Sequence, residues 1–377
     1  MRARSALFAG AAVFCLTAAA PASAAPPPAA GRGVRAQVDT VGFAVRPNDM
    51  AALLAAAHAA EDSTVAARRR ELALPPDAGW AVAIMPHDDY LYAGRVYAHL
   101  APGLRAPRWI VLGVCHACRR LGVRDQLLFD DFDAWRVAGA DVPVDAPLRA
   151  RLLAALGPDA AVVARDRQVA EHSVEALLPW LRDATPGAVF VPILVPGMSW
   201  ERLEELSARL ADALADLCRE RNWTPGRDLG LLISADAVHY GCRDWGAGGG
   251  HHPFGCDAAG HAAARARDIT LAEATLAGPL TPAGPAAFAR LVWKPGDPTD
   301  PYRITWCGLY SIPCGLETAR RLQVALGLPP LDGRLLRYGD SVTDPPLAAE
   351  GTRLGVTAPA DLEHWVGYAA MGWPATR

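Results

Sequence analysis

AVAIMPHDDY (81–90), WIVLGVCHAC (109–118) and LLISADAVHYG (231–241) are three apolar segments, and each delivers a histidine near its end. Continuous runs of Val, Ile and Leu are typical of strands buried on both faces of a parallel sheet. In α/β sheets, ligands bind beyond the carboxyl ends of such strands. The sequence therefore predicts one site shared by His87, His116 and His239.

The remaining segments alternate between helical and strand patterns. This alternation predicts an α/β fold, a three-layer αβα sandwich with a mostly parallel central sheet. Asn48 or Asp49 is placed to cap the first helix, and 127–144 is expected to form a hairpin over or beside the sheet. Further helices are predicted at 46–72, 91–100, 147–156, 171–184, 200–221 and 257–278, with a short strand leading into another helix over 303–326, and final antiparallel strands at 335–341 and 365–373.

The composition is that of a globular protein. The chain has 377 residues, 51% of them hydrophobic, and a formal net charge of −3. No later stretch resembles an interdomain linker, so we expect one domain over 34–377. Arginines form no stripe interleaved with aromatic residues, and GxSxG, P-loop, HExxH and GxGxxG motifs in their proper context are absent. These absences disfavour nucleic-acid binding and the common hydrolase and nucleotide-enzyme classes.

The amino terminus has the pattern of a secretory signal. Residues 1–24 combine two arginines, an apolar stretch and a small-residue A-S-A end, and 25–33 resemble a flexible leader. The alternative, a membrane anchor, is disfavoured because the apolar stretch is short for a membrane span. We expect an exported protein, secreted or periplasmic, with no membrane association after signal removal.

Removal of the signal would leave seven of the eight cysteines. An odd number in an oxidising compartment leaves at least one thiol for another purpose, such as metal binding. Two local pairs are candidates for disulfides, Cys115 with Cys118 and Cys242 with Cys256. The first has CxxC spacing, which is compatible with a structural disulfide, with two bystanders flanking a ligand, or with a redox pair. The structural disulfide is favoured because the following residues make a weak helix start.

Two of the strand ends carry carboxylates beside the histidine. Asp88 and Asp89 follow His87 and could orient its imidazole, although an ordinary polar loop would look the same. Asp236 lies three residues before His239, a spacing that puts both on one side of a helical turn. That pair suits a general base or a metal ligand; the alternative is a helix cap and a core histidine.

Two further residues complete the set of candidates. Cys307 follows a short apolar run and precedes a glycine, and a thiolate beside histidines is a good ligand for copper, zinc or iron. His172 lies between two glutamates in EHSVEALLPW, where it could contact a substrate or simply end a helix.

Taken together, PHDDY, GVCH, EHSVEALLPW, SADAVHYG and TWCG occur in the order typical of the Memo family, also called AmmeMemoRadiSam system protein B. VGFAVRPNDMAALL near the start and LLRYGDS with VGYAAMGW at the end extend the resemblance over nearly all of the chain after the signal. The family resembles class III extradiol dioxygenases, so the resemblance implies a fold like that of their B subunit. Their pocket binds non-haem iron through two histidines and a carboxylate.

The resemblance also implies roles for individual residues. His87, His116 and Cys307 correspond to the metal positions, His239 to the acid/base histidine, and Asp236 and His172 to the pocket lining. This sequence departs from the family in three features. Asp88 and Asp89 replace small residues, cysteines flank the second histidine, and a signal peptide is present.

These observations favour a metal-dependent redox protein or oxidoreductase that uses copper or iron, with His239 moving protons and a loop around 248–254 gating access. Dioxygenase activity itself is disfavoured, because Cys307 stands where the dioxygenases have a carboxylate ligand. A second hypothesis is a binding protein that keeps the pocket for a metal, a small molecule or a peptide. A third is a zinc-dependent hydrolase with Asp88 or Asp89 as the base.

Overall fold

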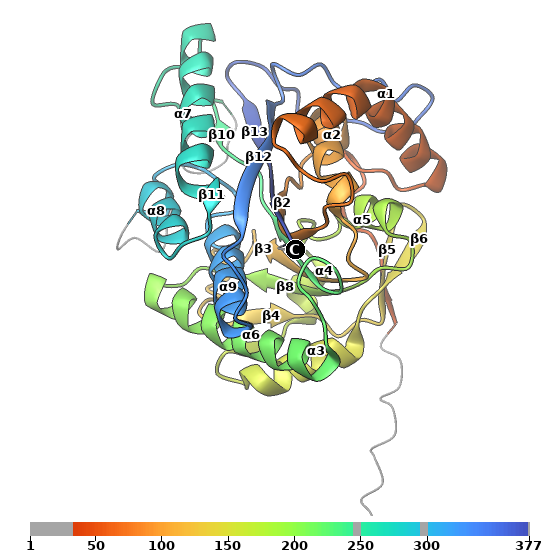
Figure 1. Ribbon diagram of the computed structural model, residues 1–377. Coiled ribbons are helices and arrows are strands. Elements are labelled where there is room, and N and C mark those ends of the chain that lie inside the picture. The colour runs from red at the N-terminus through yellow and green to blue at the C-terminus, as the bar shows by residue number, and fades with distance from the viewer. Residues whose placement is uncertain (1–32, 244–249, 295–300, 376–377) are drawn as a thin grey trace, which may run out of the picture. The chain divides into compact units, whose positions relative to one another are not determined.

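The computed structural model describes residues 33–243, 250–294 and 301–375, which belong to one compact unit (Figure 1). The predicted signal peptide and most of the predicted leader lie outside the described residues. The strands are β1 (Val34–Arg35), β2 (Trp80–Met85), β3 (Arg108–Val114), β4 (Leu127–Phe129), β5 (Ala134–Val137), β6 (Ala140–Pro143), β7 (Ala161–Val163), β8 (Val189–Val195), β9 (Gly230–Ser234), β10 (His239–Tyr240), β11 (Gly278–Pro279), β12 (Asp332–Asp340) and β13 (Trp365–Pro374). The α-helices are α1 (Pro47–Glu71), α2 (Tyr90–Leu100), α3 (Ala146–Leu156), α4 (Arg165–Val169), α5 (Leu178–Ala184), α6 (Trp200–Arg221), α7 (Ala258–Leu276), α8 (Ala283–Val292) and α9 (Ser311–Ala325), with a 3-10 turn η1 (Ala101–Gly103).

The main sheet has a parallel centre and antiparallel flanks. Its order is β11-β12-β13-β2-β9-β3-β8-β4-β7, with β10 pairing on β13. The four central strands, β2, β9, β3 and β8, run parallel. The last two strands, β12 and β13, are antiparallel as predicted. The central strands are buried almost throughout, which is why they read as continuous apolar runs.

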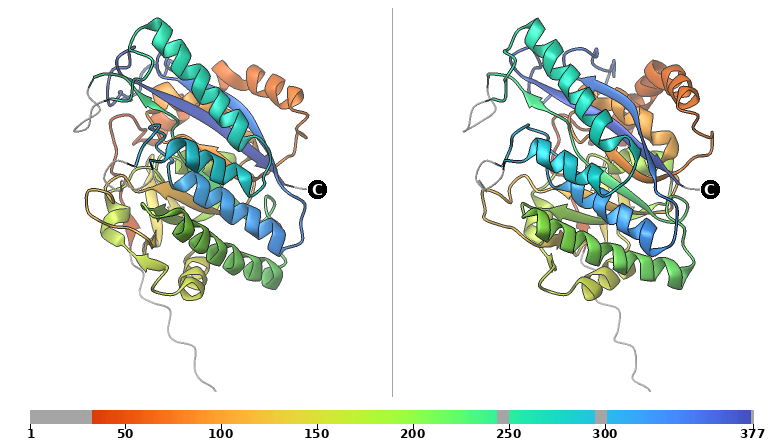
Figure 2. Two further views of the ribbon diagram at one scale, coloured as in Figure 1. Left: turned by 90° about the vertical axis from the view of Figure 1, so that its left-hand side faces the viewer. Right: turned by 60° about the vertical axis from the view of Figure 1, so that its left-hand side comes forward.

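Helices cover both faces of this sheet, which confirms the α/β sandwich. One face packs against α6, α7, α8 and α9, which lie side by side in Figure 2. The other face packs against α1, α2 and α5. Neighbouring residues of β2 divide between the two cores: Ile84 faces the first and Met85 the second. Because successive side chains of a strand point to opposite faces of the sheet, each central strand contributes to the hydrophobic cores on both sides.

Three local predictions need correction. The cap of α1 is Arg46, whose guanidinium has no acceptor atom and makes no side-chain cap hydrogen bond. It donates instead to the Asp49 carboxylate. In the segment 171–184, only Leu178–Ala184 forms an α-helix, and turns precede it.

The third correction concerns the segment 127–144. β4 joins the main sheet, and only β5 and β6 form the hairpin, which pairs with β1 in a separate small sheet.

Among the described residues, no helix is long and apolar enough to cross a membrane.

Gly315 lets α9 lie directly on the sheet. A Cβ atom there would come 2.5 Å from Cδ1 of Ile233 and 2.9 Å from Cδ1 of Leu112. Both neighbours are fully buried, so they have little room to move. We predict that Gly315→Ala lowers the free energy of unfolding by about 1–3 kcal/mol. Denaturant unfolding measures this, with Val324→Ala on the exposed side of α9 as the near-neutral control.

Candidate metal centre

His87 is placed by the end of β2. The strand stops at Met85, Pro86 follows, and His87 is 1% exposed. Its Nδ1 lies 2.8 Å from Oγ of Ser234, the last residue of the neighbouring strand β9. Its backbone N–H donates to Oδ1 of Asp236 at 2.9 Å. These contacts fix both the backbone and the ring, and they leave Nε2 turned towards the other candidate ligands.

His116 follows the end of β3 and is held by a glutamate. Its Nδ1 lies 2.8 Å from Oε1 of Glu171, and its backbone N–H donates to Oε2 at 2.8 Å. The same carboxylate accepts hydrogen bonds from the backbone of His172 and Ser173. A carboxylate on the far ring nitrogen is the usual arrangement behind a metal-binding histidine, because it fixes the tautomer that presents Nε2.

Cys307 brings a sulfur between the two imidazoles. Its Sγ lies 3.0 Å from Nε2 of His116 and 3.3 Å from Nε2 of His87. In a tetrahedral site with ordinary metal–nitrogen and metal–sulfur bonds, these atoms would be about 3.5 Å apart. The sulfur and each nitrogen are therefore within roughly half an ångström of metal-bound spacing, and these residues could hold a metal ion.

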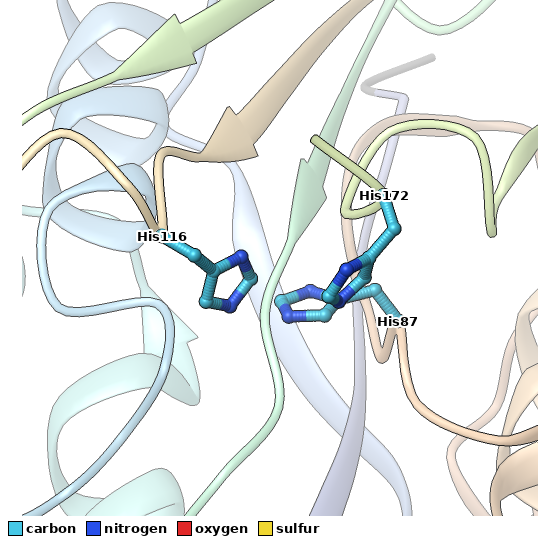
Figure 3. Close-up of side chains that lie close together, drawn as sticks. All are labelled: His87, His116 and His172. Carbon is cyan, nitrogen blue, oxygen red and sulfur yellow. The ribbon is translucent and has the colours of Figure 1, made fainter. Parts of the chain in front are cut away.

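Two more side chains offer ligand atoms at the same place. His87, Asp236 and Cys307 form one buried group that could hold a metal, and His87, His116 and His172 form a second. Figure 3 shows the three histidine rings facing one another. The ring of His172 stacks on that of His116, with centroids 4.9 Å apart. His87 belongs to both groups and is thus the common ligand of any metal bound here.

Burial and neighbouring charges set the protonation of these groups. Burial, reinforced by the surrounding histidines, lowers the pKa of His87 well below its usual value. Desolvation by the surrounding protein opposes charge on His116, although 39% of its side chain is exposed, and the charges of Cys307 and Glu171 outweigh this and raise the pKa of His116. Burial raises the pKa of the Cys307 thiol. A metal would have to displace the protons of His116 and Cys307, because imidazole and thiol groups bind metals in their deprotonated forms.

Asp236 is positioned differently from the sequence prediction. The segment between β9 and β10 is not helical, so Asp236 and His239 do not share a helical turn. The Asp236 carboxylate instead contacts His87, through the backbone bond and a 3.3 Å approach of Oδ2 to Nε2. Burial raises the pKa of Asp236 well above its usual value, with the charge of Asp88 acting in the same direction.

A cavity of about 130 Å³ is lined by three of the predicted site residues, Asp88, Asp89 and His239, whereas His87, His116 and Cys307 are not among its lining residues. Tyr368 also lines it and donates its hydroxyl proton to Asp88 Oδ2 at 2.6 Å. His172 does not line this cavity. Burial lowers the pKa of His239, so its imidazole is neutral and able to accept a proton near pH 7.

A disulfide joins Cys115 to Cys118 and so encloses His116 in a short covalent loop. The residues that follow form turns, without the helix that a thioredoxin-like redox pair normally opens. The other candidate pair, Cys242 and Cys256, is present as free thiols.

Glu171 and Ser234 were not singled out from the sequence, although they hold the two histidines. Glu171 lies next to His172, but its carboxylate reaches His116, which is 55 residues earlier in the chain. Ser234 is the last residue of a buried apolar strand. Ser234 could have been identified as a polar residue at the end of an apolar strand, because the neighbouring strand β2 leads into His87.

Comparison with known proteins decides the family. A family model for Memo-like proteins matches residues 69–341, which is well over half of the chain. The chain belongs to the Memo-like family. A MEMO1 family protein from Methanothermobacter thermautotrophicus is 28% identical over 166 residues, which cover 43% of this chain and 54% of the relative. A MEMO1 family protein from Caldivirga maquilingensis is 26% identical over 163 residues, covering 42% and 52%.

The match thus spans about half the length of these Memo-like relatives. Among solved structures, the uncharacterized protein JW3007 from Escherichia coli K12 aligns with a TM-score of 0.39 and 13% identity, covering 77% of this chain and 98% of that protein.

We predict that Glu171→Gln lowers affinity for the metal by about 10–100-fold, because an amide cannot accept both hydrogen bonds from His116 with the same strength. Titration of the metal-free chain with Cu²⁺ and Fe²⁺ measures this, alongside circular dichroism to establish that the variant is folded. Glu205→Gln on the exposed side of α6 is the matched control and should bind as the wild type does. Unchanged affinity in folded Glu171→Gln would show that the carboxylate does not position His116.

A second prediction concerns Asp89. Burial, with the charge of Asp88 adding to it, raises the pKa of Asp89 from 3.8 to about 7. The folded chain therefore binds this proton more tightly than the unfolded chain, and the contribution of Asp89 to stability decreases as the pH rises from about 4 to about 7. Asp89→Asn should flatten the fall in unfolding free energy over this range. Asp183→Asn, at an exposed position of α5, should keep the wild-type slope.

Proposed function

We propose that this chain is an exported, metal-dependent oxidoreductase that holds copper or iron through His87, His116 and Cys307. The proposal rests on the position of the Cys307 sulfur, 3.0 Å from Nε2 of His116 and 3.3 Å from Nε2 of His87, with the Nδ1 atom of each histidine held by Glu171 or Ser234. This donor set contains a soft thiolate, which favours copper or iron over magnesium.

The metal would supply a centre that changes oxidation state beside a bound substrate. The chain's own contribution is to orient that substrate and manage its protons. His239 lines the 130 Å³ cavity as a neutral imidazole and is the group proposed to take a proton from the substrate. Asp88, held by Tyr368, and Asp89, held by Thr357, provide hydrogen-bond acceptors in the same cavity.

Buried aromatic rings close this cavity on one side. Trp365 and Tyr368 are at most 1% exposed, and both line it. Their packing keeps bulk water from that wall and strengthens electrostatic interactions inside the cavity. The proposed substrate is thus a small molecule, or the end of a peptide, that places one acidic proton near His239.

The test is a comparison of variants with two readouts. We expect His87→Ala and Cys307→Ala to lose most of the bound metal in elemental analysis of protein exported from a native-like host. His239→Gln should keep its metal but lose oxygen-dependent turnover, because it removes only the proton acceptor. Oxygen consumption with a panel of phenols and thiols measures turnover.

Each contrary result has a defined meaning. Wild-type metal content in His87→Ala and Cys307→Ala would refute the metal site. Stoichiometric metal without turnover of the panel would favour the binding-protein hypothesis, and oxygen-independent ester or amide hydrolysis with zinc would favour the hydrolase. The mass of the purified amino terminus tests export, since cleavage near Ala24 is expected.

A further inference from the structure

Cys242 and Cys256 form a thiol pair away from the proposed metal ligands. Cys242 is exposed and Cys256 is partly exposed. The thiol of Cys256 is in hydrogen-bonding contact with the thiol of Cys242 and with its backbone N–H. Both are present as free thiols.

Hydrogen bonds between the residues that precede each cysteine hold the two segments together. The backbone N–H of Gly241 donates to His251 O at 3.1 Å. The hydroxyl of Tyr240 donates to Gly255 O at 3.0 Å and accepts from the Phe254 N–H at 2.9 Å. The residues just before Cys242 are thus bonded to those just before Cys256.

The segments beyond the pair are also fixed. Arg243 forms ion pairs with Asp361 and Glu363, and its backbone N–H donates to Glu363 O. Asp257 caps α7 by accepting a hydrogen bond from Gly260 at 2.7 Å. The two cysteines therefore lie on segments that neighbouring residues already hold in place.

We propose that Cys242 and Cys256 are the site of a second disulfide, formed by exchange with a low-molecular-weight disulfide, which fixes the chain directly after β10. Cys242 lies three residues after His239, so this bond would anchor the segment that carries the proposed proton acceptor. The cross-link does not depend on the metal or on export.

The chemistry is a two-step exchange. The Cys242 thiolate attacks glutathione disulfide, forms a mixed disulfide and releases one glutathione thiolate. Cys256 loses its proton to solvent and attacks the Cys242 sulfur, releasing the second glutathione. Two protein thiols are oxidised and one small disulfide is reduced to two thiols. Cys242 is exposed whereas Cys256 is only partly exposed, so Cys242 is the first nucleophile. Burial and the neighbouring thiol raise the pKa of Cys256 to about 11.

The other described cysteines are poor competitors. Cys218 and Cys314 are buried, and burial raises the pKa of each thiol to about 11. Cys307 is buried between the two histidines.

Peptide mapping of the full chain tests the proposal. Trypsin cuts after Arg227, Arg243 and Arg265, so Cys242 and Cys256 fall in separate peptides, 228–243 and 244–265. After incubation with glutathione disulfide and alkylation, we expect these peptides as one linked species that dithiothreitol separates. Cys242→Ser and Cys256→Ser should each abolish it. A non-reducing gel should show a monomer.

Thermal unfolding gives a second readout. In the same oxidising buffer, the wild type should melt roughly 3 °C or more above both serine variants, because the cross-link restricts the unfolded chain. After reduction of this bond, the difference should disappear. Recovery of both peptides as separate glutathione adducts, linkage between two copies of the chain, or linkage of either cysteine to Cys307 would overturn the proposal.

Discussion

The parallel registration of β2, β9 and β3 determines the geometry of the site. Met85 pairs with Ser234, and Leu112 pairs with Ile233, so the three strands end at nearly the same level. His87 follows the first strand by two residues, and Asp236 follows the second by two. A slip of one residue would turn every side chain to the opposite face of the sheet. The buried apolar residues on both faces of these strands resist such a slip, and in doing so they hold the candidate ligands together.

The second requirement is that polar groups in this buried region have partners. Ser234 and Glu171 satisfy the far nitrogens of the two histidines, and Asp236 accepts the backbone N–H of His87. Although burial opposes charge on Glu171, His116 lowers the pKa of that carboxyl to about 2. These contacts hold the two histidines in place without a metal ion. The Cys115–Cys118 disulfide adds a covalent restraint around His116.

The sequence was sufficient to predict the α/β sandwich and the three strands, because buried parallel strands have an unmistakable apolar pattern. The meeting of His87 with His116 follows from the same logic of strand ends. Cys307 lies nearly two hundred residues after His116, so local patterns do not predict that the two side chains meet. The family resemblance implied that Cys307 belongs to the same site. Long-range partners such as Glu171 could not be predicted, because no periodicity links a turn residue to a histidine on another segment.

Residue spacing in the sequence did not determine the backbone conformation at two places. A separation of three residues suggested that Asp236 supports His239, but the chain between them is not helical, and the carboxylate reaches His87 instead. The helix expected from residue 171 begins at Leu178, because residues 171–173 turn so that their backbone N–H groups and the Glu171 carboxylate meet near His116. Local patterns could not reveal these demands of the tertiary structure.

X-ray absorption spectroscopy of the chain loaded with one equivalent of copper or iron tests the central claim most directly. The account predicts one sulfur scatterer at about 2.3 Å and two imidazole nitrogens at about 2.0 Å, with the sulfur lost in Cys307→Ser. A shell made only of nitrogen and oxygen atoms, or a spectrum unchanged in Cys307→Ser, would contradict it.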